Sequence, residues 1–115
     1  MGAEEFEHFA QGKTMRHAFN EAVEEAEYDH GHSGYTGTIA EKSHFTNFGS
    51  LPSGTTESEL MDWIYDGCFP DGSLIAHHFK DKAEEISGTY TDKWGPAAGF
   101  EIKPGKYVFV GLASS

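Results

Sequence analysis

Apolar side chains recur every three or four positions between residues 15 and 26, and polar side chains fill the positions between them. This spacing places the apolar residues along one stripe of a helix: Met15, Phe19, Ala22, Val23 and Ala26. Thr14 is a favourable N-cap, and Gly31 is a favourable stop. The pattern predicts an amphipathic helix over residues 14–30, which is the strongest helix signal in the chain.

Two more helices are predicted in the middle of the chain. Thr56 and Glu59 have the spacing of a capping box, in which a hydroxyl and a carboxylate satisfy the first unpaired amides of a helix. We expect that helix to end at Gly67. Asp71 is placed to cap a further helix that ends at Gly88. This last helix would carry one apolar stripe, formed by Ile75, Phe79, Ala83 and Ile86.

The last third of the chain changes to strand signals. Residues 100–103 and 106–112 flank the dipeptide Pro104-Gly105, which is typical of a hairpin turn. Residues 107–110 are apolar on both faces, which predicts a central strand.

A second hairpin is predicted from residues 38–40 and 44–48, which read as short strands joined around Glu41-Lys42. The elements together predict a single domain over residues 1–115. Its fold class would be α+β, with two layers: about three helices packed on one face of a small, mainly antiparallel sheet.

Charge then narrows the range of partners. The 115 residues carry a net charge of −11, and the acidic excess lies in the first 90 residues. Such a field repels a phosphate backbone, so we expect no nucleic-acid partner. No apolar run is long enough to span a membrane, so we expect no membrane partner. Cys68 is the only cysteine, which leaves no intramolecular disulfide, and the acidic N-terminus lacks a secretory signal; we expect a cytoplasmic protein.

A glycine-rich segment after the first helix is one candidate for ligand binding. Gly31, Gly34 and Gly37 let backbone amides point into a common hollow, and hydroxyl side chains lie between them. Loops of this kind cradle phosphates at the N-terminus of a helix, whereas this segment leaves the C-terminus of one. A tight connection from helix to strand therefore stays open as the other interpretation.

Trp94 is a second candidate, because a large ring in a loop rich in Gly and Pro offers a stacking platform. It would equally serve as a lid over a small core. Lys93, Lys103 and Lys106 make the C-terminal end the basic one, so a phosphate-bearing ligand would be received near Trp94. No cofactor is expected. The complete predicted ligand-binding set is His32, Gly34, Tyr35, Thr36, Gly37, Thr38, Lys42, Lys93 and Trp94.

Metal binding and catalysis have weaker signals. His30 and His32 lie close together beside acidic residues, but no third ligand follows at a recognised spacing, so we expect no metal site. Cys68 is better interpreted as a small buried thiol than as a nucleophile. His44-x-Thr46 lacks the second histidine motif that a phosphoesterase of that type needs. A small enzyme that acts on a nucleotide or phosphoester stays open as an alternative, ranked after a binding protein.

Three segments carry a resemblance to known sequences. His30-Gly-His-Ser-Gly-Tyr-Thr-Gly-Thr-Ile-Ala-Glu-Lys42, Asp92-Lys-Trp-Gly-Pro-Ala97 and Tyr107-Val-Phe-Val-Gly-Leu-Ala-Ser114, in this order, resemble a small family of uncharacterised proteins of phages and bacterial genomes. The resemblance brings no activity and no catalytic residue. It implies a small accessory protein of a mobile element, which would act in the cytoplasm of the host cell.

Two functions are therefore predicted. The first is the binding, or sequestering, of a small anionic ligand, above all a nucleotide or nucleotide-derived signal, as a counter-defence. We expect a homo-oligomer for this function, because a chain this small makes a deep pocket more easily between two copies.

The second function is that of an acidic inhibitor that mimics DNA and plugs a basic groove of a host enzyme. Its carboxylates would come from two helices, Glu21, Glu24, Glu25 and Asp29 from the first and Glu57, Glu59, Asp62 and Asp66 from the second. Its affinity would fall steeply with added salt, whereas a pocket that stacks its ligand would lose much less.

Overall fold

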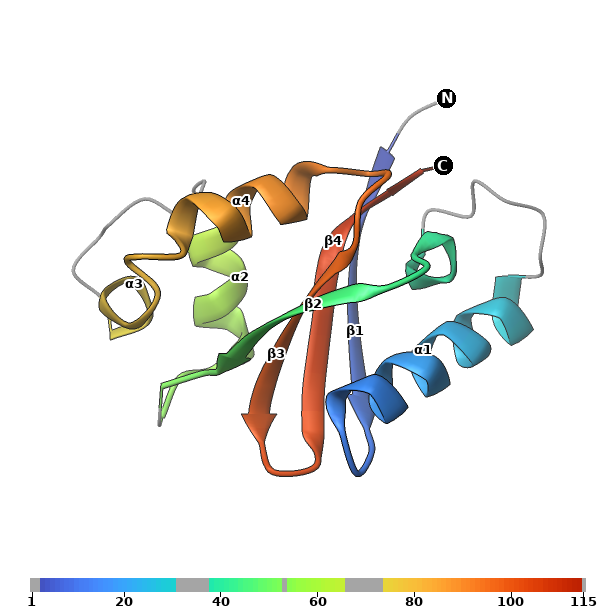
Figure 1. Ribbon diagram of the computed structural model, residues 1–115, viewed down its shortest axis with the longest axis horizontal. Coiled ribbons are helices and arrows are strands. Elements are labelled where there is room, and N and C mark those ends of the chain that lie inside the picture. Colours follow the sequence, from blue (N-terminus) through green and yellow to red (C-terminus); the bar gives the residue numbers. More distant parts are fainter. Residues whose placement is uncertain (1–2, 31–37, 53, 66–73, 115) are drawn as a thin grey trace.

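The computed structural model describes residues 3–30, 38–52, 54–65 and 74–114 and confirms the α+β class (Figure 1). In chain order its elements are β1 (Ala3–Gln11), α1 (Met15–His30), the 3-10 helix η1 (Ile39–Glu41), β2 (Phe45–Ser50), α2 (Glu57–Tyr65), α3 (Leu74–His78), α4 (Ala83–Thr91), β3 (Ala97–Lys103) and β4 (Lys106–Ser114). The strands form one sheet in the order β1-β4-β3-β2. Only β2 and β3 pair in parallel, so this described sheet is mainly antiparallel, as predicted.

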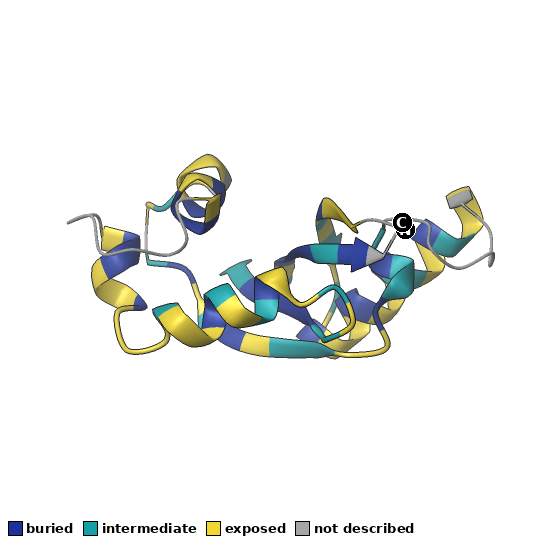
Figure 2. Cartoon of the chain, turned by 90° about the horizontal axis from the view of Figure 1, so that it is seen from above, coloured by how far each residue is buried: buried dark blue, intermediate teal, exposed yellow. Residues whose placement is uncertain are grey.

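Helices cover both faces of the sheet, and the prediction that they share one face was wrong. Strand β4 is central, and its side chains alternate between two cores: Tyr107 and Phe109 belong to the α1 cluster, whereas Val108 and Val110 belong to the cluster of α2, α3 and α4. Figure 1 shows α1 on one side of the strands and the other three helices on the opposite side. Seen from above, the buried positions gather along the strands between the helices (Figure 2).

Helix α1 follows the sequence prediction closely. The Thr14 hydroxyl accepts a hydrogen bond from the backbone amide of His17 at 3.1 Å, which is the geometry of an N-cap. The predicted stripe is buried at Met15, Phe19, Ala22 and Ala26. The helix lies close to β3, because a Cβ atom at Gly99 would come within 2.9 Å of the Met15 sulfur. Glycine at this position therefore lets α1 approach the sheet.

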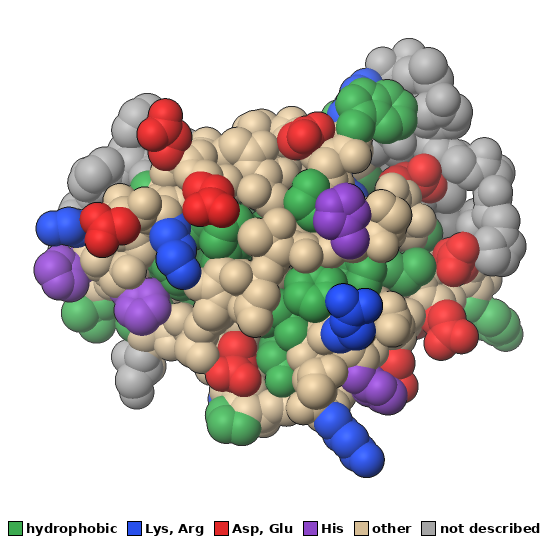
Figure 3. Space-filling view, viewed as in Figure 1, with side chains coloured by type: hydrophobic (Ala, Val, Ile, Leu, Met, Phe, Trp, Pro, Cys, Tyr) green, Lys and Arg blue, Asp and Glu red, His purple; other side chains and the backbone are tan. Residues whose placement is uncertain are grey.

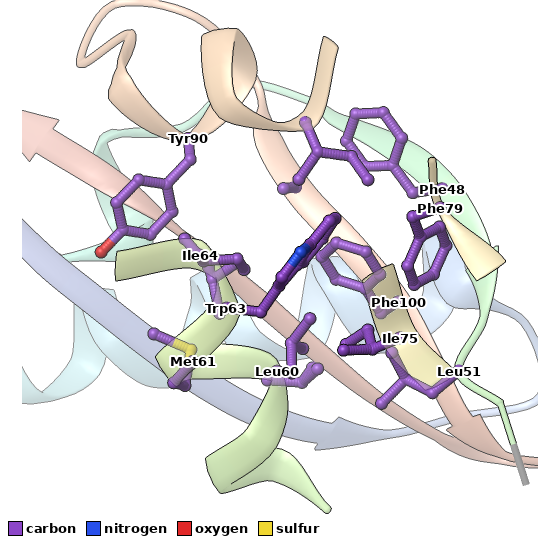
Figure 4. Close-up of a cluster of buried hydrophobic side chains, with 14 of the residues drawn as sticks. Phe48, Leu51, Leu60, Met61, Trp63, Ile64, Ile75, Phe79, Tyr90 and Phe100 are labelled. Atoms are coloured by element: carbon purple, nitrogen blue, oxygen red, sulfur yellow. The ribbon is translucent and has the colours of Figure 1, made fainter. Parts of the chain in front are cut away.

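The second core lies under α2, α3 and α4, and five of its fifteen buried residues are aromatic (Figure 4). Thr56 caps α2 as predicted, because the Glu59 amide donates to the Thr56 hydroxyl at 3.2 Å. The Glu59 carboxylate accepts from that same hydroxyl at 3.3 Å, so only the Thr56 half of the predicted capping box is seen. Phe79 stacks on Trp63 with ring centroids 5.8 Å apart, and it meets Phe100 edge-on at 5.5 Å.

The single helix predicted to start at Asp71 and end at Gly88 is two helices where it is described. The amide of Lys82 bonds to the Phe79 carbonyl at 2.8 Å, so the chain turns directly after Phe79 and α4 starts afresh. Helix α4 then continues past Gly88 to Thr91. Packing of Phe79 between Trp63 and Phe100 accounts for the break, since a tertiary contact outweighs helix propensity. Asp71 and Gly67 lie outside the described residues.

Two strand predictions also change. The predicted strand 38–40 and its hairpin are wrong: Thr38 caps η1 by accepting a hydrogen bond from the Ala40 amide at 3.2 Å. The predicted strand 44–48 corresponds to β2. Strand β1 was not predicted, although Phe6, His8 and Ala10 alternate with exposed residues along it.

The Pro104-Gly105 hairpin is confirmed as the turn between β3 and β4. Gly105 has a φ of 86°, which favours glycine at this turn. The central position predicted for residues 107–110 is also confirmed, because β4 pairs with both β1 and β3.

Candidate functional site

The predicted ligand-binding residues are only partly described. His32, Gly34, Tyr35, Thr36 and Gly37 lie outside the described residues, whereas Thr38, Lys42, Lys93 and Trp94 lie inside them. The described members come from two segments, η1 with its caps and the loop between α4 and β3. Lys42 joins these segments by direct contact, although they are about fifty residues apart in sequence.

Lys42 is a buried support and does not present its charge on the surface. Its side chain is only 3% exposed, and its ammonium donates to the carbonyls of Asp92 and Gly95, each at 3.0 Å. The ammonium also lies 5.9 Å from the centre of the Phe6 ring. Burial lowers the pKa of Lys42, and the Asp92 carboxylate offsets part of that effect. The sequence predicted that Lys42 supplies charge to a ligand, whereas in the structure its buried ammonium holds the loop of residues 92–95 in place.

The loop that Lys42 supports presents Trp94 to solvent. The Trp94 side chain is 66% exposed, and the Lys93 ammonium lies 5.1 Å from the centre of its ring. The Trp94 amide donates to the Asp92 carboxylate at 3.0 Å. A Cβ atom at Gly95 would lie 2.6 Å from that same carboxylate, so a larger residue there would displace the Asp92 side chain. The tryptophan is consequently held on a well-defined loop.

The sequence suggested that the basic residues of the C-terminal third gather near Trp94, but the structure does not bring them together there. Lys103 pairs with Lys106 beside the β3–β4 turn, whereas Lys93 precedes the start of β3. A strand of this length separates the two ends by about 20 Å. Among the described residues Lys93 therefore contacts the Trp94 ring, whereas Lys103 and Lys106 lie at the far end of the sheet.

A different surface gathers acidic and aromatic side chains. Exposed Glu21, Glu24 and Glu25 follow one side of α1, and Tyr28, which is 91% exposed, stands at its C-terminal end. Figure 3 shows acidic side chains over this part of the molecule. We call the surface formed by Glu21, Glu24, Glu25 and Tyr28 of α1, together with Phe9 of β1, the acidic face.

The acidic face contains two shallow hollows. One has a volume of about 490 Å³ and is lined by Glu21, Glu24, Glu25 and Tyr28. The other, of about 410 Å³, has Glu21, Glu25, Phe9, Ala10, Lys106 and Tyr107 among its lining residues. Because β1 is an edge strand, this second hollow extends along that edge and takes residues from both faces of the sheet.

Two histidines lie beside carboxylates of α1. His8 of β1 lies 3.7 Å from the Glu25 carboxylate, and His17 lies 3.8 Å from that of Glu21. Both contacts become ion pairs only when the imidazole is protonated.

The predicted two-helix array of carboxylates is contradicted by the fold. Glu59 and Asp62 belong to α2, which packs on the opposite side of the sheet from α1. They cannot continue a row that starts at Glu21 and Glu24. Asp66 lies outside the described residues. The two predicted rows of carboxylates therefore lie on opposite faces of the sheet, and the row on α1 adjoins the edge strand β1.

The described residues add two negative findings. In the ranges that the structure describes, no three side chains of His, Cys, Asp or Glu lie together as a metal ion would require. His32 and Cys68 fall outside those ranges. Among the described helices, none is both long enough and apolar enough to cross a lipid bilayer.

Comparisons of the chain with models of protein families, with curated proteins and with solved structures found no match. The function is therefore argued from the geometry of this chain alone.

Proposed function

We propose that the chain is an acidic binding protein that docks its acidic face onto a basic surface of another protein. The observation that supports this most is the pair of hollows that share Glu21 and Glu25. If the chain is an accessory protein of a mobile element, as the resemblance implies, the partner is a protein of the host cell. This proposal retains the acidic inhibitor predicted from the sequence, but on one helix and one strand edge.

Charge and aromatic surface supply different parts of the binding. Clustered carboxylates attract a basic partner over a long distance and raise the rate of encounter. Exposed aromatic side chains give the apolar contact that holds a complex together, and Phe9 and Tyr28 are 43% and 91% exposed. A face with both features fits a groove that carries arginine or lysine side chains, because carboxylates satisfy the cations while the rings exclude water.

The test compares two double variants that remove the same charge. Glu21→Gln with Glu25→Gln alters the acidic face, and Glu84→Gln with Glu85→Gln alters exposed acids at the start of α4. The probe is a labelled arginine-rich peptide, followed by fluorescence anisotropy at low and physiological salt. We expect the α1 variant to weaken binding about tenfold and the α4 variant less than about twofold. Equal losses in both variants would show a non-specific charge effect and contradict the proposal.

A second candidate function is the binding of a small anionic ligand at Trp94. It is favoured by one observation, the exposed indole on a loop that Lys42 and Gly95 hold in place, with Lys93 against the ring. A nucleotide base would stack on the indole, and its phosphate would meet Lys93. In this candidate function, the backbone amides of residues 31–37 bind the phosphate, as the glycine-rich sequence predicts.

Tryptophan fluorescence separates the second candidate from the first. The chain has two tryptophans, of which Trp63 is 2% exposed, so a bound nucleotide would change the emission of Trp94. A hundredfold excess over the dissociation constant should stabilise the protein by about 2.7 kcal/mol in a thermal-shift screen. Native mass spectrometry would report whether two copies share the ligand. Absence of both signals for every nucleotide tested would remove this candidate.

A further inference from the structure

Strand β1 forms one edge of the sheet, and that edge is long and regular. Among the described residues β1 pairs with β4 on one side, and no described strand pairs with its other side. The register with β4 runs without a shift over all nine residues, and the strand contains neither proline nor glycine. An uninterrupted edge of this kind is a template on which a further strand can pair.

The hydrogen-bond pattern identifies the backbone groups that face the open edge. Gly12 continues the register of β1, and its amide donates to the carbonyl of Gly105 at 3.1 Å. Bonded positions alternate along an antiparallel ladder, so the even-numbered residues of β1 bond to β4. The N–H and C=O groups of the odd-numbered residues, with Glu5, Glu7 and Phe9 in the middle, therefore point to the open edge. All the odd-numbered residues of β1 are exposed.

Carboxylates flank this edge on both faces of the sheet. Glu5 and Glu7 lie opposite β4 residues that contact the core of α2, α3 and α4, so their side chains share that face. On the other face, the carboxylate of Glu25 lies 3.7 Å from a histidine of β1. The hollow of about 410 Å³ along the edge has Glu21, Glu25 and Phe9 among its lining residues.

The charge of β1 selects against a second copy of the chain as the occupant of this edge. Glu4, Glu5 and Glu7 lie close together on the strand, and all three are exposed. Pairing two β1 strands would bring these carboxylates near those of the other copy, and like charges across a strand pair are destabilising. A strand that carries basic side chains meets opposite charge on both faces instead.

We propose that an extended basic segment of a partner protein adds to the sheet as a further strand beside β1. This inference rests on the proposed function, because the segment is the part of the basic partner that meets the acidic face. Its backbone pairs with the outward groups of Glu5, Glu7 and Phe9. Its side chains alternate between the two faces, so arginine or lysine on one face reaches Glu7 and on the other reaches Glu21 and Glu25.

Three labelled peptides of one sequence test the backbone pairing. Each is as long as β1, is blocked at both ends and alternates arginine with valine; one is unmodified, one is N-methylated at every arginine, and one at every valine. Only every second amide of an added strand faces β1. By fluorescence anisotropy we expect one methylated peptide to bind at least about tenfold more weakly than the unmodified peptide, and the other within about threefold. Equal affinities of the two methylated peptides, or no binding of the unmodified one, would overturn strand addition.

Glu7 offers a matched pair of protein variants. Its amide is not used in the ladder with β4, so Glu7→Pro keeps that ladder but places its ring where the added strand would pair. Glu7→Gln removes the same charge and keeps the amide. We expect the unmodified peptide to bind Glu7→Pro at least about tenfold more weakly and Glu7→Gln less than about threefold more weakly. Circular dichroism reports whether the proline variant is folded.

Hydrogen exchange in the wild-type protein needs no variant. Binding of the unmodified peptide should slow exchange at the amides of Glu5, Glu7 and Phe9 at least about tenfold. Unchanged exchange at these three amides in the complex would overturn the proposal. Slow exchange in the free protein, together with a dimeric mass, would do so too, because a second copy would then occupy the edge.

The acidic-face variant Glu21→Gln with Glu25→Gln separates this inference from the proposed function. It should weaken all three peptides and preserve the difference between the two methylated ones. A loss of affinity in this variant without slowed exchange at the β1 amides would support docking on the acidic face and overturn strand addition. Slowed exchange without a loss in the variant would support strand addition and contradict the proposed function.

Discussion

Replacing Phe109 by alanine is expected to lower the free energy of unfolding by about 3–5 kcal/mol. The ring is fully buried on the central strand, and it contacts Phe19 of α1 at 5.4 Å and Phe45 of β2 at 5.7 Å between centroids. Its removal leaves a cavity between the sheet and the helix that carries the acidic face. Urea unfolding monitored by circular dichroism measures the change.

Phe9→Ala deletes the same side chain from a position that is 43% exposed, and it should cost only about 1 kcal/mol. Both variants remove a phenylalanine ring, so the difference between their losses of stability measures the effect of burial. Similar losses at positions 9 and 109 would mean that α1 does not cover the second face of the sheet. The placement of α1 on the opposite face of the sheet from the other helices would then be wrong.

The second large effect is expected at Lys42. Lys42→Met keeps most of the buried stem but removes the donor to the carbonyls of Asp92 and Gly95. Each abandoned carbonyl costs about 1–3 kcal/mol, so we expect a loss of about 2–4 kcal/mol in urea unfolding. Hydrogen exchange at the Gly95 amide, which bonds to the Asp92 carbonyl, should accelerate at the same time. Lys80→Met, at an exposed position, should change neither quantity.

The difference between wild type and Lys42→Met should also depend on pH. Burial lowers the pKa of Lys42 in the folded protein, whereas the unfolded chain has the ordinary value of 10.5. As pH rises from the folded pKa towards 10.5, the folded protein releases a proton that the unfolded chain still holds. Wild type therefore gains stability relative to the variant in that window. A difference that shrinks with rising pH would show that the ammonium is not buried as described.

Local signals in the sequence predicted local structure well. The Thr14 cap, the Thr56 cap and the Pro104-Gly105 turn each depend on neighbouring residues, and the structure confirms all three. Strand β1 was missed because Glu4, Glu5 and Glu7 hide the weak alternation of Phe6, His8 and Ala10. The edge position explains this composition, since charged residues are common on edge strands.

The placement of helices depends on contacts between distant segments, which the sequence pattern constrains only partly. The apolar character of residues 107–110 on both faces indicated a strand covered from both sides, and the two cores around β4 agree with that signal. The prediction used it to place the strand centrally but still put every helix on one face.

The candidate sites could be predicted less well than the fold. A lysine in sequence suggests a surface charge, and nothing local reveals that Lys42 reaches the carbonyls of a loop about fifty residues away. The same holds for Tyr90 of α4, which packs against Tyr65 of α2 and lies near Glu5 of β1. Glu21, Glu24 and Glu25 were identified correctly as one row on a helix, because that row needs only helical spacing.

Mapping the arginine-rich peptide on isotope-labelled protein by NMR tests the proposed function most directly. We expect the largest shifts at Glu21, Glu24, Glu25, Tyr28 and Phe9, and we expect them to diminish steeply as salt is added. Shifts centred on Trp94, or spread evenly over the acidic residues of α2 and α4 as well, would contradict the assignment of the acidic face as the docking surface.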